Sequence, residues 1–209
     1  NSFHKKQDAI KGVNQSLTHL GLKYVDLVLV HWPDAQGNLD VWSGLEEVQK
    51  MGWAKSIGVS NFNQQQIENI IKHSKVVPAN NQIPSSPFNN QEKLIEFCHS
   101  HNISVTAYSP LGSGDKRLLE HAVVKSIAQK HKKTAAQVLI RFHIERNVIV
   151  IPKSAKKERI QENFNVFDFK LTPDEIKKID SLNKNERVVD PKPAKTHKYY
   201  PFNEPLNDL

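Results

Sequence analysis

In the stretch Ala54-Lys55-Ser56-Ile57-Gly58-Val59-Ser60-Asn61, a short apolar run leads directly into two polar residues. A run of this length, bounded by polar residues, is typical of a buried β-strand. Similar runs occupy residues 24–30, 79–83, 103–107 and 148–152, and each has polar or charged side chains at its carboxyl end. Parallel strands of a (β/α) barrel point these ends at one rim, so the polar residues are expected to meet in one pocket.

Amphipathic helical patterns separate these runs. Apolar residues recur at helical spacing within residues 7–20, 41–51, 64–73, 90–99 and 121–131. Capping residues predict three further helices: Thr134 with Gln137, Ser154 before a helix to about Phe164, and Thr172 with Pro173 and Glu175. The alternation of strand and helix predicts an α/β fold with a parallel sheet and crossover helices.

The composition is that of an ordinary globular protein of 209 residues, with 38% hydrophobic and 24% charged residues. Because the chain has no long apolar run and its first residues are polar, we expect neither a membrane span nor a signal peptide. The single cysteine, Cys98, fits the reducing cytoplasm. The net charge of +7 comes from scattered lysines without an aromatic-interleaved patch, which disfavours nucleic acid as a partner.

Several motifs occur in a fixed order along the chain. They are Val30-His31-Trp32-Pro33, Gly58-Val59-Ser60-Asn61-Phe62, Asn81-Gln82, Tyr108-Ser109-Pro110-Leu111-Gly112 and Ile151-Pro152-Lys153-Ser154. Together they closely resemble the aldo-keto reductases over about residues 7–202, and Tyr200-Pro201-Phe202-Asn203 resembles the aldose and aldehyde reductase branch. The resemblance implies a single oxidoreductase domain over residues 1–209. It also implies a cytoplasmic, monomeric (β/α)8 TIM barrel that reduces small aldehydes and ketones with NADPH and uses no metal.

The resemblance covers only part of the family's barrel. A complete member has eight strands, and this chain matches the last five β/α units with the carboxyl-terminal helix and tail. The family's proton-donor tyrosine, partner aspartate and activating lysine precede the matched region, and Tyr24 and Tyr108 occupy other motif positions. We therefore expect a carboxyl-terminal fragment of a longer protein, inactive by itself.

The resemblance gives His31 and Trp32 roles at the substrate. His31 would be the catalytic residue that orients the substrate carbonyl, since a neutral imidazole can donate one hydrogen bond. Trp32 would supply an apolar wall for the substrate. Considered alone, each residue would more often belong to the hydrophobic core.

Four residues would hold the nicotinamide. Ser60, Asn61 and Gln82 offer the donors and acceptors that a carboxamide needs, and Tyr108 has a flat face for stacking on the ring. Without the resemblance, the first three could be turn or cap residues, and Tyr108 a buried structural residue.

The cofactor's phosphates would be held by two segments. Ser109, Leu111 and Ser113 match positions that contact the pyrophosphate, and they precede a short charged stretch, residues 115–117, where the family has a cofactor clasp. The second segment would take the 2′-phosphate of NADPH through Lys153, Ser154 and Arg159, because a helix amino terminus with added cations suits a dianion. A solvated basic turn is the alternative interpretation.

Glu162 and Asn163 would hold the adenine, one turn beyond the phosphate site. The chain has no G-x-G-x-x-G fingerprint, so a Rossmann domain is not expected. NADP is favoured over NAD because only NADP carries the 2′-phosphate that the basic cluster would bind.

The sequence departs from the family pattern at three positions. Pro84 and Ser86 stand where the family commonly has an acid and a histidine, and Lys156 stands where it often has threonine. The first two changes remove polar support near the nicotinamide, and the third adds charge near the 2′-phosphate. Apart from these departures, a non-catalytic NADPH-binding or crystallin-like protein of the same fold, which keeps the cofactor half but lacks the proton donor, is the alternative to a reductase.

Overall fold

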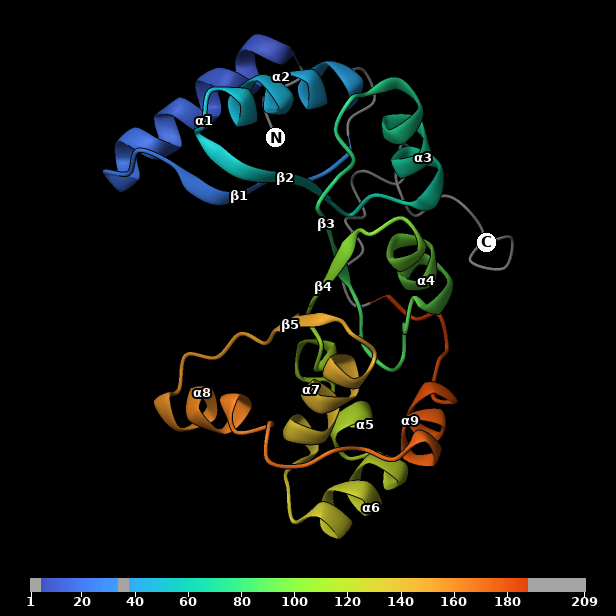
Figure 1. Ribbon diagram of the computed structural model, residues 1–209. Coiled ribbons are helices and arrows are strands. Elements are labelled where there is room, and N and C mark those ends of the chain that lie inside the picture. Colours follow the sequence, from blue (N-terminus) through green and yellow to red (C-terminus); the bar gives the residue numbers. More distant parts are fainter. Residues whose placement is uncertain (1–4, 34–37, 188–209) are drawn as a thin grey trace. The chain divides into compact units, whose positions relative to one another are not determined.

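The computed structural model describes residues 5–33 and 38–187 (Figure 1). In chain order, the elements are α1 (Lys6–Leu20), β1 (Val25–Val30), α2 (Asn38–Lys50), β2 (Ala54–Ser60), α3 (Gln64–His73), β3 (Asn80–Pro84), α4 (Glu92–Ser100), β4 (Ser104–Tyr108), the 3-10 helix η1 (Gly112–Gly114), α5 (Lys116–Leu119), α6 (Ala122–His131), α7 (Ala135–Glu145), β5 (Ile149–Ile151), α8 (Lys157–Phe164) and α9 (Pro173–Asp180). The tail motif at residues 200–203 lies outside the described residues.

The strands confirm the predicted α/β class with a parallel sheet. They follow one another in the order β1-β2-β3-β4-β5. Pairing is parallel for β1 with β2, β2 with β3, and β4 with β5. Each strand lies within two residues of the run that predicted it. The two short helices η1 and α5 are additions, since their few residues carry no helical periodicity.

Two of the three predicted capping sites are confirmed. Thr134 with Gln137 and Thr172 with Glu175 form capping boxes at the starts of α7 and α9. The prediction that Ser154 caps α8 is wrong, because Lys156 occupies the N-cap position and provides no side-chain cap. The Ser154 hydroxyl instead accepts a hydrogen bond from the Lys156 N–H at 3.2 Å, closing a local turn ahead of the helix.

The chain divides into two compact units. Among the described residues, unit 1 comprises residues 5–33, 38–82 and 93–104, and unit 2 comprises residues 83–92 and 105–187. In unit 1, a Cβ added at Gly44 would lie 2.6 Å from the Lys6 carbonyl oxygen, and one at Gly58 would lie 2.6 Å from the Asn80 carbonyl oxygen. Only glycine therefore allows α2 to approach the start of α1, and β2 to approach β3, this closely.

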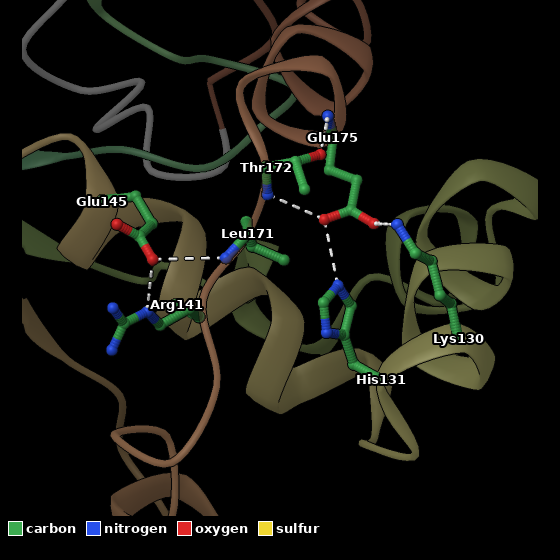
Figure 2. Close-up of polar contacts among 7 residues, drawn as sticks. All are labelled: Lys130, His131, Arg141, Glu145, Leu171, Thr172 and Glu175. Carbon is green, nitrogen blue, oxygen red and sulfur yellow. Dashed lines mark hydrogen bonds and ion pairs between the residues drawn. The ribbon is translucent and has the colours of Figure 1, made fainter.

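The core of unit 2 gathers apolar side chains from α5, α6, α7 and α9. Its fully buried members include Leu118, Val124, Leu139, Phe142 and Ile179. Figure 2 shows the polar contacts around the start of α9, where the buried Glu175 accepts hydrogen bonds from Lys130 at 2.6 Å and from the Thr172 N–H at 2.9 Å. The His131 ring lies 3.0 Å from the same carboxylate. This carboxylate therefore fastens α9 to the end of α6.

A second ion pair in unit 2, between the buried Arg141 and the half-buried Glu145, joins α7 to the chain ahead of α9. Arg141 Nε donates to Glu145 Oε1 at 2.7 Å, and the Leu171 N–H donates to the same oxygen at 3.2 Å (Figure 2). The Arg141 guanidinium also donates to the Val166 carbonyl at 3.1 Å. Pairing and hydrogen bonding together satisfy these charges.

Candidate active site

The predicted polar residues of unit 1 meet where β1 and β2 end, beside Gln82 in the middle of β3. Ser60 and Asn61 are buried, and the Ser60 hydroxyl donates to the Gln82 carbonyl at 2.8 Å. The Asn61 N–H donates to the same carbonyl at 2.9 Å. Asn61 Nδ2 donates to the His31 carbonyl at 3.0 Å and to the Ser60 hydroxyl at 3.1 Å. Asn61 thus links β1, β2 and β3 by hydrogen bonds.

This linkage uses much of the donor capacity of the site. Both hydrogens of the Asn61 amide, and the hydroxyl hydrogen of Ser60, are directed at groups within the protein. The Asn61 backbone is left-handed, with φ 62°, a conformation that asparagine tolerates better than most residues. Gln82 accepts the hydrogen bonds from Ser60 and Asn61 through its backbone carbonyl rather than through its side chain.

His31 and Trp32 lie side by side just after β1. Their ring centroids are 6.1 Å apart and the rings are inclined by 41°. His31 is exposed and Trp32 is half-buried. Within residues 5–33 and 38–187, the His31 ring makes no hydrogen bond or ion pair, so it is accessible to a ligand. The structure therefore does not place His31 in the hydrophobic core.

Two of the three departures from the family pattern, Pro84 and Ser86, lie in unit 2 and are buried. The Pro84 carbonyl accepts hydrogen bonds from Asn89 Nδ2 at 3.4 Å and from Gln91 Nε2 at 3.3 Å. The backbones of Ser86 and Asn89 pair with each other. The Ser86 hydroxyl, although buried, has no hydrogen-bond partner within the described residues. This segment is consequently held by backbone and amide groups rather than by the acid and histidine of the family pattern.

The loop after β4 is a compact series of turns in unit 2. The Gly112 N–H donates to the Ser109 carbonyl at 3.0 Å, and the Gly114 N–H to the Leu111 carbonyl at 3.1 Å. The Ser113 and Ser109 hydroxyls are 3.3 Å apart. Ser109, Gly112, Ser113 and Gly114 all have positive φ. The N–H groups of Gly112 and Gly114 are therefore used within the loop, and the predicted pyrophosphate contacts of Ser109, Leu111 and Ser113 stay a prediction.

Tyr108 ends β4 immediately before this loop. It is half-buried, and burial raises the pKa of its phenol to about 12, against the opposing charge of Arg187. The hydroxyl therefore stays protonated over the physiological pH range. A neutral, flat and half-buried ring is compatible with the predicted stacking role.

The start of α8 carries a cluster of cations without partners. Within residues 5–33 and 38–187, no hydrogen bond or ion pair engages the charged groups of Lys153, Lys156, Lys157 and Arg159, and all four residues are exposed. The first-turn N–H groups of α8 also lack a side-chain cap. Positive charge and uncapped N–H groups thus coincide at one helix end, which is an arrangement that attracts anions.

The two predicted adenine residues differ in their surroundings. The Glu162 carboxylate accepts a hydrogen bond from the Thr134 hydroxyl at 2.5 Å, and its carbonyl accepts one from Gln137 Nε2 at 3.2 Å. Asn163 lines a largely apolar cavity of about 840 Å³ together with Val150 and Pro152. The sequence does not predict this hydrogen bond between Glu162 and Thr134, the N-cap of α7, because the two residues are 28 positions apart.

The predicted site residues therefore form two groups. Unit 1 brings together His31, Trp32, Ser60, Asn61 and Gln82, and unit 2 carries Tyr108, Ser109, Leu111, Ser113, Lys153, Ser154, Arg159, Glu162 and Asn163. Among the described residues, no three His, Cys, Asp or Glu side chains are placed to hold a metal ion. No helix in that part of the chain combines the length and apolarity needed to cross a bilayer.

A profile of the Aldo/keto reductase family matches residues 1–184. The chain belongs to this family. It is 43% identical over 189 residues to the 9,11-endoperoxide prostaglandin H2 reductase of Trypanosoma cruzi, covering 90% of this chain and 67% of that protein. The predicted family and barrel class are thus confirmed.

Solved structures agree with this assignment. The Bombyx mori aldo-keto reductase AKR2E4 in complex with NADP matches with a TM-score of 0.90 and 38% identity, over 95% of this chain and 70% of that chain. The aldose reductase of Schistosoma japonicum matches with a TM-score of 0.91 and 39% identity, over 98% and 73%. The chain thus spans roughly seven tenths of the length of these relatives.

Proposed function

We propose that this protein reduces aldehydes and ketones to alcohols by hydride transfer from NADPH. The observation that carries the proposal is the cluster of cations at the start of α8, which have no ion-pair partner among the described residues, in a chain of the Aldo/keto reductase family. A related reductase of Bombyx mori has been crystallised with NADP. We further propose a cytoplasmic monomer in which residues 1–209 act as one domain.

The cofactor part of the proposal rests on charge. Lys153 and Arg159 would bind the 2′-phosphate as cations, and Ser154 would add a hydroxyl close by, since its side chain is already folded toward the start of α8. Like charges gathered without partners repel one another, and a bound dianion would relieve that repulsion. Ser109, Leu111 and Ser113 would bind the pyrophosphate, and Glu162 and Asn163 the adenine.

The substrate part of the proposal rests on His31. Its exposed imidazole would donate a hydrogen bond to the carbonyl oxygen, which gains negative charge as hydride arrives at the carbon. Trp32, beside it, would contact the apolar part of the substrate. Ser60, Asn61, Gln82 and Tyr108 would hold the nicotinamide, with the hydrogen-bonded strand ends keeping the first two in place.

Hydride transfer also requires a proton for the oxygen. The family's proton-donor tyrosine, with its aspartate and lysine, has no matching position in residues 1–209. We therefore expect this 209-residue chain to bind NADPH without reducing an aldehyde detectably, whereas a form that supplies the three residues turns over. Cofactor binding is measured by quenching of protein fluorescence, and turnover by NADPH consumption with 4-nitrobenzaldehyde.

Replacement of His31 separates binding from chemistry in a form that turns over. His31→Ala should lower kcat by at least about a hundredfold, through lost orientation and hydrogen bonding, and leave the Kd of NADPH nearly unchanged. Near-normal turnover of this variant would exclude the catalytic role. NADPH binding without turnover in a form that carries all three residues would favour the non-catalytic, crystallin-like alternative.

A further inference from the structure

The charged stretch after the turn loop makes a contact that its sequence does not predict. Arg117 Nη2 donates to Glu186 Oε1 at 2.5 Å, and Nη1 donates to Oε2 at 3.4 Å. The two residues are 69 positions apart and both belong to unit 2. The guanidinium thus meets the Glu186 carboxylate with two nitrogens, which is the most directional form of this ion pair.

Arg117 also holds the residue that ends the turn loop. Its Nε lies 3.1 and 3.0 Å from the two carboxylate oxygens of Asp115, and its Nη2 lies 2.5 Å from one of them. The Arg117 N–H donates to Asp115 at 2.8 Å, which makes Asp115 the cap of α5. Hydrogen bonding from Arg117 lowers the pKa of the Asp115 carboxyl, so this carboxyl stays charged near neutral pH.

The partner segment is itself fixed by its backbone. The N–H groups of Lys184 and Glu186 both donate to the Phe88 carbonyl, at 3.0 and 2.9 Å. Phe88 is buried, the Lys184 ammonium lies 4.2 Å from its ring centroid, and the Arg117 guanidinium lies 5.7 Å from it. Glu186 therefore presents its carboxylate from an anchored backbone, so less side-chain and chain freedom is lost when the pair forms than at an ordinary surface site.

The turn loop depends on such an anchor. Four of the residues between Ser109 and Gly114 have positive φ, and two of those, Ser109 and Ser113, are not glycine. Such conformations persist only where the surrounding structure holds them. The Asp115 N–H continues the same series of turns, donating to the Gly112 carbonyl at 3.1 Å.

We propose that Arg117, held between Asp115 and Glu186, is a positioning residue that fixes the 109–115 loop for the pyrophosphate shared by NADPH and NADH. This inference rests on the proposed function. Arg117 acts through the loop backbone and is not itself a ligand of the reacting atoms. Its loss should therefore weaken both cofactors by the same factor, unlike the loss of a residue that binds the 2′-phosphate.

The test compares Kd values for NADPH and NADH in the 209-residue chain and its variants. Arg117→Ala and Glu186→Gln should each raise both Kd values about three- to tenfold and leave their ratio unchanged. Arg117→Lys, which keeps the charge but loses the planar fork, should fall between wild type and Arg117→Ala. Lys125→Ala and Glu120→Gln are matched controls, since both residues are exposed and have no ion pair in the described structure, and they should change neither Kd more than twofold.

The outcomes separate this inference from the proposal on which it rests. If the wild-type chain binds neither cofactor, the proposed function fails and the inference fails with it. If the wild-type chain binds and both Arg117→Ala and Glu186→Gln bind equally well, only the inference is overturned. A loss confined to NADPH would also overturn it, because Arg117 would then act on the 2′-phosphate. Glu186→Gln keeps Arg117 in place, so a folding defect of Arg117→Ala leaves the test decisive.

Discussion

The strand ends of unit 1 and the start of α8 in unit 2 hold polar groups in opposite ways. Ser60 and Asn61 are buried. Their side chains donate hydrogen bonds to the carbonyl groups of His31 and Gln82, and Asn61 also donates to the Ser60 hydroxyl. Lys153 and Arg159 are exposed and have no partner among the described residues. The donors of the first region are hydrogen-bonded within the protein, whereas the second region carries charge that a bound anion would neutralise.

This difference predicts that substitutions in the first region lower stability, whereas substitutions in the second weaken the binding of an anion. Removal of a buried, hydrogen-bonded group leaves its former partners unsatisfied, so the protein loses stability. Removal of an exposed, unpaired cation leaves stability almost unchanged, and its effect appears only when an anion is bound.

The largest loss is expected for Asn61→Ala. This change removes two hydrogen bonds, leaves the His31 carbonyl and Ser60 hydroxyl without that donor, and places alanine at φ 62°. We expect a loss of about 3 to 4 kcal/mol in urea-induced unfolding. Asn102→Ala is the matched control, because Asn102 is exposed and has φ 57°. It should lose only about 1 kcal/mol, and equal losses in the two variants would show that the buried hydrogen bonds contribute nothing.

A smaller, pH-dependent loss is expected for Glu175→Gln in unit 2. Burial raises the pKa of Glu175, but hydrogen bonds from Lys130, the Thr172 N–H and His131 outweigh it and lower the pKa to about 2. Because the folded value lies below the unfolded one, this stabilisation is present above about pH 4.5 and is lost as the pH falls toward 2. Glu175→Gln should therefore lose about 2 to 3 kcal/mol at pH 7.

The pH series gives the check on Glu175. Unfolding free energies of wild type and Glu175→Gln should converge between pH 4.5 and 2. Asp174→Asn, an exposed carboxylate in the same first turn of α9, controls for the helix dipole and should change stability by less than about 0.5 kcal/mol. A difference between wild type and Glu175→Gln that persists unchanged at pH 2 would contradict the assignment of the stabilisation to the charged carboxylate.

Local patterns in the sequence predict the fold well, because strands and helix caps are encoded by neighbouring residues. The run ending at Ser60 predicts β2, and Thr172 with Glu175 predicts the start of α9. Ser154 does not cap α8, because its hydroxyl closes a turn with the Lys156 N–H just before the helix begins at Lys157. A capping residue and a turn residue have the same side chain, so spacing alone does not separate them.

The site is less predictable where contacts join distant residues. Motif positions indicate that Ser60 and Asn61 share one end of a strand, but not that the Asn61 amide is used up by neighbouring groups. Likewise, nothing near Arg117 in the sequence indicates Glu186 as its partner. Such contacts depend on how the chain folds back, which short-range periodicity does not encode.

Arg159→Ala tests most directly whether the start of α8 binds the 2′-phosphate of NADPH. This variant should change the free energy of unfolding by less than about 0.5 kcal/mol. It should weaken NADPH binding by about 1.5 to 3 kcal/mol, the contribution of a hydrogen bond to a charged group, and barely change NADH binding. Kd values for both cofactors are obtained from quenching of tyrosine and tryptophan fluorescence. A selective loss of NADPH affinity is the predicted result, and equal losses for NADPH and NADH would contradict the assignment.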